Sequence, residues 1–330
     1  MKKRFPNTRL RRLRATKSLR NLIRENSLSP HDLIQPIFLI EGRNKIEKVN
    51  TMPNIYRYTV DKAIVEIKKL KKLGLEAIAL FPCINKKHKD LTGSESYNPG
   101  GLIQKAISEI RLKINDITII SDVALDPYTS HGQDGIISKK GDVLNDETIE
   151  VLIKQALSHA ECGTDIIAPS DMMDGRIKKI RQALEKNSYH NTILLSYSAK
   201  YSSNFYGPFR DAVGSAKNLG SSNKNTYQMD YSNKKDAINE IELDINEGAD
   251  IVMVKPSLPY LDIISRINEK FNIPIFAYQV SGEYSMIKAV SKNNWLDEKK
   301  IVLETLTSIK RAGANAIITY FAKDALKWMK

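Results

Sequence analysis

From residue 33 onward, the chain alternates between short apolar runs and longer amphipathic segments. The short runs are rich in Ile, Val, Leu or Phe and are too short for helices, which predicts eight buried strands: Leu33–Ile40, Glu76–Phe81, Ile117–Ala124, Asp165–Pro169, Thr192–Ser198, Ile251–Lys255, Pro274–Val280 and Ala316–Tyr320. The amphipathic segments predict helices, among them Asp61–Lys72, Leu102–Lys113, Asp146–Cys162, Lys234–Glu247 and Asp297–Ala312. Gly313 follows the last of these, as expected at a helix end. This order is typical of βα units around a parallel sheet.

Eight such units favour a closed (β/α)8 barrel, the TIM barrel, over an open sheet. A doubly wound sheet usually has a GxGxxG turn after its first strand, whereas this chain has Glu41-Gly42-Arg43-Asn44 there. Barrels of about 250 residues or more still form one domain. We therefore predict an N-terminal arm over residues 1–30 and a TIM barrel over residues 31–330.

The net charge of +13 is concentrated at the N-terminus. Residues 1–24 contain ten Lys or Arg and no acidic residue, and the remainder holds 41 basic against 38 acidic residues. A basic arm suits nucleic acid phosphates or an acidic surface on a neighbouring subunit, and the charge alone leaves both open.

Composition also bears on location. With 42% hydrophobic residues, the chain contains no run near the roughly 18 apolar residues of a membrane span. The basic opening lacks the apolar core of a secretory signal, which predicts a cytoplasmic protein without a membrane partner. Organelle transit peptides share the Arg-rich, acid-poor opening, so an organelle is the alternative. Cys83 and Cys162 form neither a disulfide framework nor a metal knuckle.

Two lysines follow apolar runs at the predicted catalytic end of the barrel. Lys200 comes just after Thr192–Ser198, and Lys255 ends Ile251–Lys255. Burial disfavours an ammonium ion, and a second ammonium nearby disfavours it further, so at least one amine is expected to be partly neutral near pH 7. A neutral amine attacks ketones, which predicts Schiff-base chemistry on one or two carbonyl substrates.

Other polar residues follow the strands at the same rim: Asp122, Asp126, Ser170, Asp171, Asp174, Ser281 and Tyr320. The segment after Lys200 contains Gly207, Pro208, Gly214, Gly220, Ser221 and Ser222, and we interpret it as a lid. Its cations Arg210 and Lys224 are candidates to bind a substrate carboxylate.

Several motifs carry a family resemblance: Ser196-Tyr197-Ser198-Ala199-Lys200, Phe205-Tyr206-Gly207-Pro208-Phe209-Arg210-Asp211-Ala212, Met253-Val254-Lys255-Pro256 and Tyr278-Gln279-Val280-Ser281-Gly282-Glu283-Tyr284. Together they closely resemble the porphobilinogen synthase, or delta-aminolevulinic acid dehydratase, family over nearly the whole chain. The resemblance implies a lyase that condenses two 5-aminolevulinate molecules to porphobilinogen, with loss of two waters, in haem and tetrapyrrole biosynthesis.

The resemblance also implies roles for single residues. Lys255 would form a Schiff base with the substrate that supplies the propionate side, whose carboxylate meets Ser281 and Tyr320. Lys200 would serve the other substrate, whose carboxylate meets Arg210 and Lys224. Asp122 is a candidate proton acceptor or orienting group, although the sequence does not rank it against Asp126 or Asp174.

The residues at the family's active-site metal positions differ from those of its zinc-dependent members. Where those members have three cysteines, this chain has Ala124, Asp126 and Asp134. Thiolate zinc binding is therefore not expected, and carboxylates favour hard cations or a metal-free site. Glu240 matches the family's allosteric Mg²⁺ ligand. The resemblance further implies a homo-octamer in which the arm wraps a neighbouring barrel, and we therefore favour subunit packing over nucleic acid binding.

Two alternatives remain. A Schiff-base aldolase on the same barrel would need only one essential lysine, whereas Lys200 and Lys255 both lie in matching motifs. A nucleic-acid-binding protein acting through residues 1–24 would show binding that weakens with salt.

Overall fold

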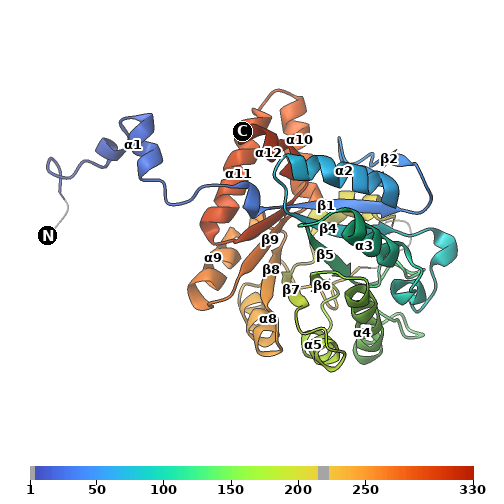
Figure 1. Ribbon diagram of the computed structural model, residues 1–330. Helices are drawn as coiled ribbons and strands as arrows, with labels where there is room; N and C mark the ends of the chain where they lie inside the picture. The colour runs from blue at the N-terminus through green and yellow to red at the C-terminus, as the bar shows by residue number, and fades with distance from the viewer. Residues whose placement is uncertain (1–3, 215–222) are drawn as a thin grey trace.

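The computed structural model describes residues 4–214 and 223–330, which form a barrel and an N-terminal arm (Figure 1). Eight parallel strands make the barrel: β1 (Leu33–Ile40), β4 (Ala77–Cys83), β5 (Thr118–Val123), β6 (Ile166–Pro169), β7 (Ile193–Lys200), β8 (Ile251–Lys255), β9 (Ile275–Gln279) and β10 (Ala316–Thr319). The sheet closes because β10 pairs with β1, with Leu33 opposite Ile317. The predicted barrel is confirmed, and all eight predicted strands are present with ends shifted by at most two residues.

Helices surround the barrel: α2 (Val60–Lys72), α3 (Leu102–Lys113), α4 (Asn145–Glu161), α5 (Arg176–Lys186), α6 (Gly207–Ala212), α8 (Lys235–Asn246), α9 (Leu261–Lys270), α10 (Ser281–Lys292), α11 (Glu298–Ala312) and α12 (Ala322–Trp328). Helix α2 shows why they pack there. Its buried residues Ala63, Ile64, Ile67 and Leu70 recur every three or four positions and so form one face against the sheet. As predicted, α11 ends at Gly313, whose φ of 120° suits glycine.

Shorter elements complete the described chain. Strands β2 (Ile46–Lys48) and β3 (Tyr56–Tyr58) form an antiparallel pair beside β1. The 3₁₀ helices are η1 (Leu10–Arg14), η2 (Pro30–Asp32), η3 (Lys86–His88), η4 (Ser94–Tyr97), η5 (Asn204–Tyr206) and η6 (Leu258–Tyr260). In the described part of the chain, every helix lacks the length and apolar character needed to cross a membrane.

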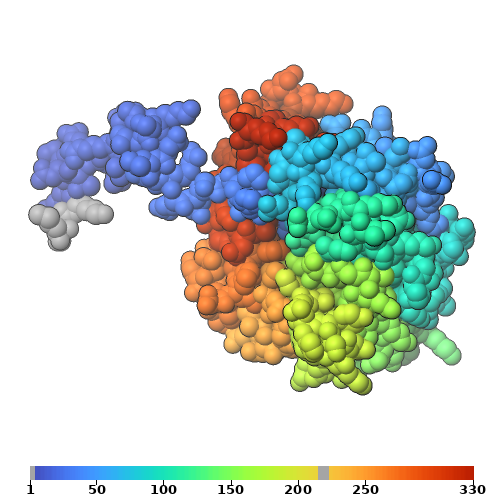
Figure 2. Space-filling view, in the orientation of Figure 1, coloured from blue at the N-terminus to red at the C-terminus, as the bar shows by residue number. Residues whose placement is uncertain are grey.

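The arm extends away from the barrel, and η1 and α1 (Lys17–Leu22) lie within it (Figures 1 and 2). None of the residues of these two helices is buried. Several arm side chains that normally pack in a core are exposed: Phe5, Leu10, Leu13, Leu22 and Ile23. The arm therefore presents apolar surface that its own barrel does not cover.

Candidate active site

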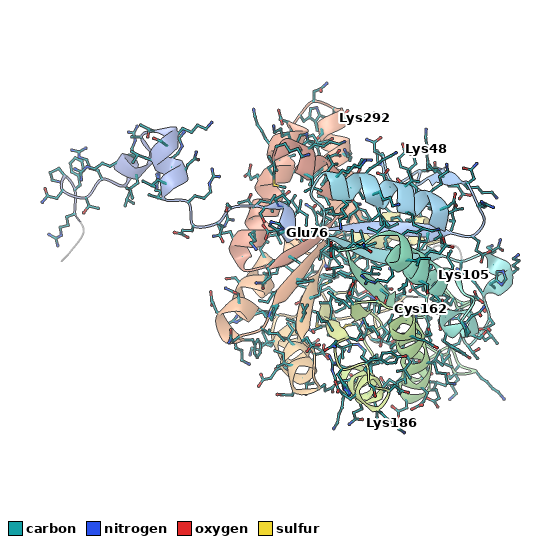
Figure 3. All side chains as sticks on the ribbon, viewed as in Figure 1. Lys48, Glu76, Lys105, Cys162, Lys186 and Lys292 are labelled. Carbon is teal, nitrogen blue, oxygen red and sulfur yellow. The ribbon has the colours of Figure 1, made fainter. Side chains whose placement is uncertain are left out.

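The two lysines lie side by side at the carboxyl ends of adjacent strands. Lys200 ends β7, Lys255 ends β8, and the two residues are direct partners in the sheet. Each is only 5% exposed. Lysines of the outer helices, such as Lys186 and Lys292, point into solvent instead (Figure 3). The structure therefore brings together the two amines that the sequence indicated.

Four aromatic rings surround the amine of Lys255. The distances from Nζ to the ring centroids are 5.1 Å for Tyr197, 5.2 Å for Tyr206, 5.1 Å for Phe209 and 4.8 Å for Tyr278. We call these four residues the aromatic cage. Burial, reinforced by the positive charge of Lys200, lowers the pKa of Lys255 to about 7, although Asp122 acts in the opposite direction. A substantial fraction of this amine is therefore neutral at neutral pH, as nucleophilic attack requires.

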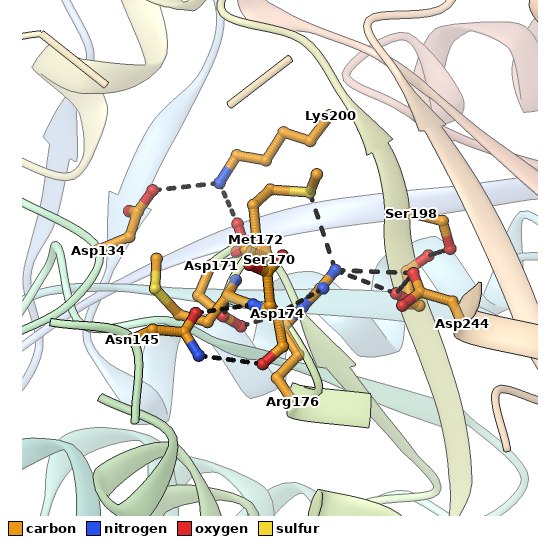
Figure 4. Close-up of polar contacts among 12 residues, drawn as sticks. Asp134, Asn145, Ser170, Asp171, Met172, Asp174, Arg176, Ser198, Lys200 and Asp244 are labelled. Atoms are coloured by element: carbon orange, nitrogen blue, oxygen red, sulfur yellow. Dashed lines mark hydrogen bonds and ion pairs between the residues drawn. The ribbon is translucent and has the colours of Figure 1, made fainter. Parts of the chain in front are cut away.

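Lys200 has a polar environment. Its Nζ donates to the Ser170 carbonyl oxygen and lies 3.5 Å from Asp134 Oδ2 (Figure 4). Lys200 therefore contacts a carbonyl and a carboxylate, whereas the aromatic cage surrounds the amine of Lys255 with rings. The two lysines thus have different surroundings although their backbones are paired.

Three aspartates accompany the lysines. Asp122 of β5 is half-buried, and burial raises its pKa to about 7 against the opposing charges of Lys255 and Lys200. Burial also raises the pKa of Asp126. Burial alone would raise the pKa of Asp134 as well, but Lys200 and Lys224 hold it well below its usual range. Asp122 is therefore suited to exchange a proton near neutral pH, whereas Asp134 is a fixed anion.

Lys224, which the sequence placed on the lid, lines the same cavity as Lys200 and Lys255. Its side chain is buried, and its Nζ lies 2.8 Å from Asp134 Oδ1 and 3.3 Å from Asp126 Oδ2. Gln228 adds a 3.4 Å contact to Asp134 Oδ2. The predicted lid residues Gly220, Ser221 and Ser222 lie outside the described residues.

Helix α6 carries the other expected lid cation. Arg210 is partly exposed and lines the same cavity as Lys200 and Lys255. Ser281 at the start of α10 holds this segment, because its Oγ accepts a 2.9 Å bond from Phe209 N and donates to the Phe205 carbonyl at 3.2 Å. In this structure Ser281 therefore fixes the segment that brings Phe209 to Lys255.

Tyr320 lies directly after β10 and contacts the cage through Tyr278 of the neighbouring strand β9. Its hydroxyl is 2.9 Å from that of Tyr278, and both side chains are buried. The cavity between the two lysines measures about 30 Å³. Since a single water needs roughly 10–15 Å³ on this scale, entry of an organic substrate requires the segments above the cavity to move.

The rim aspartates after β6 do not enter this cavity. Asp171 is buried, and its Oδ2 is 3.5 Å from Arg176 Nε. Arg176 also donates to Ser196 Oγ at 3.2 Å, and Ser196 in turn donates to Asp244 at 2.6 Å (Figure 4). Burial raises the pKa of Asp171 to about 6, opposed by Arg176. This network ties the segment after β6 to β7 and α8.

Glu240 of α8 lies in a separate hollow of about 510 Å³, which we call the acid pocket. The pocket is lined by five carboxylates: Asp142, Asp174, Asp230, Asp236 and Glu240. Asp174, which the sequence placed beside the catalytic rim, belongs here. Burial raises the pKa of Glu240 to about 7, although the positive charge of Arg176 acts in the opposite direction.

Across residues 4–214 and 223–330, no three His, Cys, Asp or Glu side chains converge closely enough to hold a metal directly. The pocket fits a hydrated hard cation, because Mg²⁺ commonly retains several waters.

The aromatic cage and the Arg176 network were missed by sequence reasoning about the site. Tyr197, Tyr206, Phe209 and Tyr278 lie in the motifs that contain the expected site residues. Aromatic residues in and after buried strands are also typical of an ordinary core, however, so only the fold distinguishes a cage from packing.

The fold and the site define a TIM-barrel enzyme with two adjacent buried lysines at the carboxyl ends of its strands. The chain belongs to the delta-aminolevulinic acid dehydratase family, whose model matches residues 7–328.

Curated relatives that carry the name delta-aminolevulinic acid dehydratase support this family assignment. The protein of Bradyrhizobium diazoefficiens is 50% identical over 98% of this chain and 91% of its own length, and that of Methanothermus sociabilis is 52% identical over 98% and 99%. The crystal structure of delta-aminolevulinic acid dehydratase (porphobilinogen synthase) from Toxoplasma gondii ME49, in complex with the reaction product porphobilinogen, superimposes with a TM-score of 0.95. It is 44% identical, and the match covers 97% of this chain and 91% of that chain.

Proposed function

We propose that this chain condenses two molecules of 5-aminolevulinate to one molecule of porphobilinogen, with loss of two waters. The observation that carries the proposal is the pairing of Lys200 and Lys255 in one cavity, in a family whose product-bound relative has the same fold. Two ketone substrates require two activated carbonyls, and two adjacent amines supply them. The reaction is a step of tetrapyrrole biosynthesis.

Lys255 forms the Schiff base with the substrate that provides the propionate side. The neutral amine attacks the ketone carbon, and the carbonyl oxygen leaves as water when the iminium forms. The aromatic cage supports this assignment, since its rings stabilise a cation that has little access to water. Ser281 and Tyr320 bind the carboxylate of this substrate, which requires Ser281 to exchange its present backbone partners.

Lys200 forms the imine with the second substrate, whose carboxylate binds Arg210 and Lys224. Arg210 supports this role because it lines the cavity and is partly exposed. Lys224 must turn from Asp126 and Asp134 to reach a carboxylate. Asp122 accepts a proton during condensation, and its pKa of about 7 permits both protonation states.

Zinc does not fit the three positions that matched metal-binding cysteines. Ala124 offers no ligand atom, and the carboxylates of Asp126 and Asp134 already contact the Lys224 ammonium group. Soft thiolate ligands favour zinc at such a site, and these three positions supply none. We therefore assign no step to zinc.

The acid pocket supports an allosteric role for Mg²⁺. Glu240 would hold the ion together with water, and the other four carboxylates would raise its local concentration. We also propose that the arm packs on a neighbouring barrel in a homo-octamer, supported by its exposed apolar residues.

A direct assay tests the reaction. Purified protein is incubated with 5-aminolevulinate, and porphobilinogen is measured with Mg²⁺, Zn²⁺ or chelator added separately. Product formation that persists under zinc-selective chelation is the expected result. Absence of porphobilinogen under every condition, with the protein folded, would refute the proposed activity.

A further inference from the structure

Glu283 is a buried carboxylate in the first turn of α10, and its contacts join two strand ends. Its Oε1 accepts hydrogen bonds from Leu258 N at 2.7 Å and from Ser257 Oγ at 3.1 Å. Its Oε2 accepts from Val280 N at 2.6 Å and from Ser257 N at 3.4 Å. One carboxylate therefore ties the segment that follows β8 to the residue that links β9 and α10.

These two segments carry the groups expected to bind one substrate. Ser257 comes two residues after Lys255, and Val280 immediately precedes Ser281. In the proposed function, on which this inference rests, Lys255 binds the ketone carbon and Ser281 the carboxylate of the same molecule. The carbon chain between those two points has a fixed length, so the span between Lys255 and Ser281 has to match it.

The start of α10 also contacts the segment that precedes α6. Gly282 lies so close to that segment that a Cβ atom there would be 2.6 Å from the Phe205 carbonyl oxygen. The hydroxyl of Tyr206, the next residue, donates to the Lys255 carbonyl oxygen at 3.1 Å. The backbone of Lys255 and the first turn of α10 are thus connected through a second route, which limits how far one can shift relative to the other.

Glu283 makes more contacts than the capping of α10 requires. The bond from Val280 N is the one that caps the helix, whereas the other three reach the segment after β8. Burial raises the pKa of Glu283 to about 7, and the backbone amides of Leu258, Val280 and Ser257 oppose that rise. Since the carboxylate faces donors, an amide in its place would set its own N–H group against backbone N–H groups.

We propose that Glu283 is a positioning residue that sets the span between the Lys255 amine and Ser281, and thereby the chain length of the keto acid that binds at Lys255. Glu283 does not line the cavity of the two lysines, so it acts through the two segments it joins. Its loss should therefore change the preference between keto acids of different length, which a contribution to stability alone would leave unchanged.

The experiment uses two keto acids, 4-oxopentanoate and 5-oxohexanoate. The first has the keto-to-carboxylate span of 5-aminolevulinate, and the second is one methylene longer. The initial rate of borohydride trapping at Lys255, measured by mass against keto acid concentration, gives an apparent dissociation constant for each. We expect the parent to bind the shorter acid about tenfold more tightly, the discrimination that one methylene commonly gives, and Glu283→Gln to prefer it by about threefold or less.

Asp32→Asn is the matched control. Asp32 is also a buried carboxylate that accepts a backbone bond, from Ser29 N at 2.7 Å, but it precedes β1 at the end of the barrel opposite the lysines. Its substitution should leave the preference at the parental value. Ser257→Ala covers the case in which Glu283→Gln does not fold. It removes one of the four bonds to Glu283 and should lower the preference by a smaller factor.

The outcomes separate this inference from the proposed function. The inference is overturned, with the proposed function intact, if the parent traps both acids at Lys255 without preference or if folded Glu283→Gln keeps the parental preference. An equal loss of preference in Asp32→Asn overturns it too, as does a parental preference in Ser257→Ala where Glu283→Gln does not fold. Absence of trapping at Lys255 of the parent with both acids would overturn the proposed function and this inference together.

Discussion

Lys200 and Lys255 are direct sheet partners because β7 holds one residue more than β8 just before them. Ser196 pairs with Val252 and Ala199 with Val254, so three steps along β7 match two along β8. Side chains alternate between the faces of a sheet, and one additional residue reverses the alternation beyond it. Without this bulge Lys200 would point to the opposite face from Lys255. The two-amine site therefore depends on a backbone irregularity as well as on two lysines.

Replacing either lysine by methionine should remove turnover while preserving the fold. Methionine approximates the length of the side chain but offers no amine, so Lys200→Met and Lys255→Met should each lower kcat by at least about 10³-fold. Lys292→Met, on the exposed face of α10, serves as the control and should be unaffected. Borohydride reduction with substrate should add mass at Lys255 of the parent protein. Near-parental activity in either folded lysine variant would exclude the two-amine mechanism.

The sequence predicted the barrel and the lysines, but not how the lysines differ. Strand runs such as Leu33–Ile40 are recognisable because both faces of a barrel strand are buried. Lys200 and Lys255 were identifiable because two lysines each follow an apolar run and both lie in motifs that resemble the family.

The remaining features arise from packing between distant segments. The bulge in β7 leaves no signal in the sequence, because the strand is buried on both faces and so shows no simple alternation of polar and apolar residues. Lys224 meets Asp134 across 90 residues of sequence, and no local pattern encodes that contact. Asp174 looked equivalent to Asp122 in the sequence, yet it lines the acid pocket and not the cavity of the two lysines.

Imine formation at Lys255 should depend on pH near neutrality. The pKa of Lys255 is lowered to about 7, so the amine is mostly charged below this pH and mostly neutral above it. The pKa of Asp122 is also raised to about 7, so Asp122 likewise becomes able to accept a proton as the pH rises. We therefore expect kcat/KM to rise with pH and to level off above about 7. A rise that continues toward the ordinary lysine value of 10.5 would show that Lys255 is not perturbed in this way.

Phe209→Leu should weaken imine formation at Lys255. The substitution keeps an apolar side chain but removes one ring of the aromatic cage, which lies 5.1 Å from Nζ. A cation–π contact is worth about 1 kcal/mol, so the imine formation constant should fall roughly fivefold. The matched control is Phe271→Leu, which removes a ring 4.8 Å from Lys270 on an outer helix. Equal borohydride trapping at Lys255 in Phe209→Leu and Phe271→Leu would mean that the cage does not stabilise the iminium ion.

Glu240→Ala should reduce or abolish stimulation by Mg²⁺ while leaving both lysines reactive. Glu240 is the carboxylate expected to contact the ion, and its loss removes both a ligand and a charge from the acid pocket. Glu242→Ala is the matched control, because Glu242 lies on the same helix but pairs with Lys270 at the surface. Activity is measured across a Mg²⁺ titration, with trapping at Lys255 as the check on the site. If Mg²⁺ stimulates Glu240→Ala as strongly as the parent protein, the stimulating ion binds outside the acid pocket.

Deletion of residues 1–24 should yield assemblies smaller than those of the full chain, with weaker activity. The arm contacts little of its own barrel and exposes apolar side chains, including Leu13 at 53% and Leu22 at 81%. Burying them against another barrel would stabilise an assembly, because burial of a leucine is worth about 1.5–3 kcal/mol.

A second variant separates apolar packing from charge. Leu13→Ser with Leu22→Ser keeps all ten basic residues of the arm, so it should dissociate as the deletion does if packing holds the arm. Sedimentation velocity of the full chain, the deletion and the double variant, with activity measured on the same samples, decides between the two causes. If the deletion sediments as the full chain does, the arm has no part in assembly. If only the deletion dissociates, Leu13 and Leu22 are not the residues that hold the arm in place.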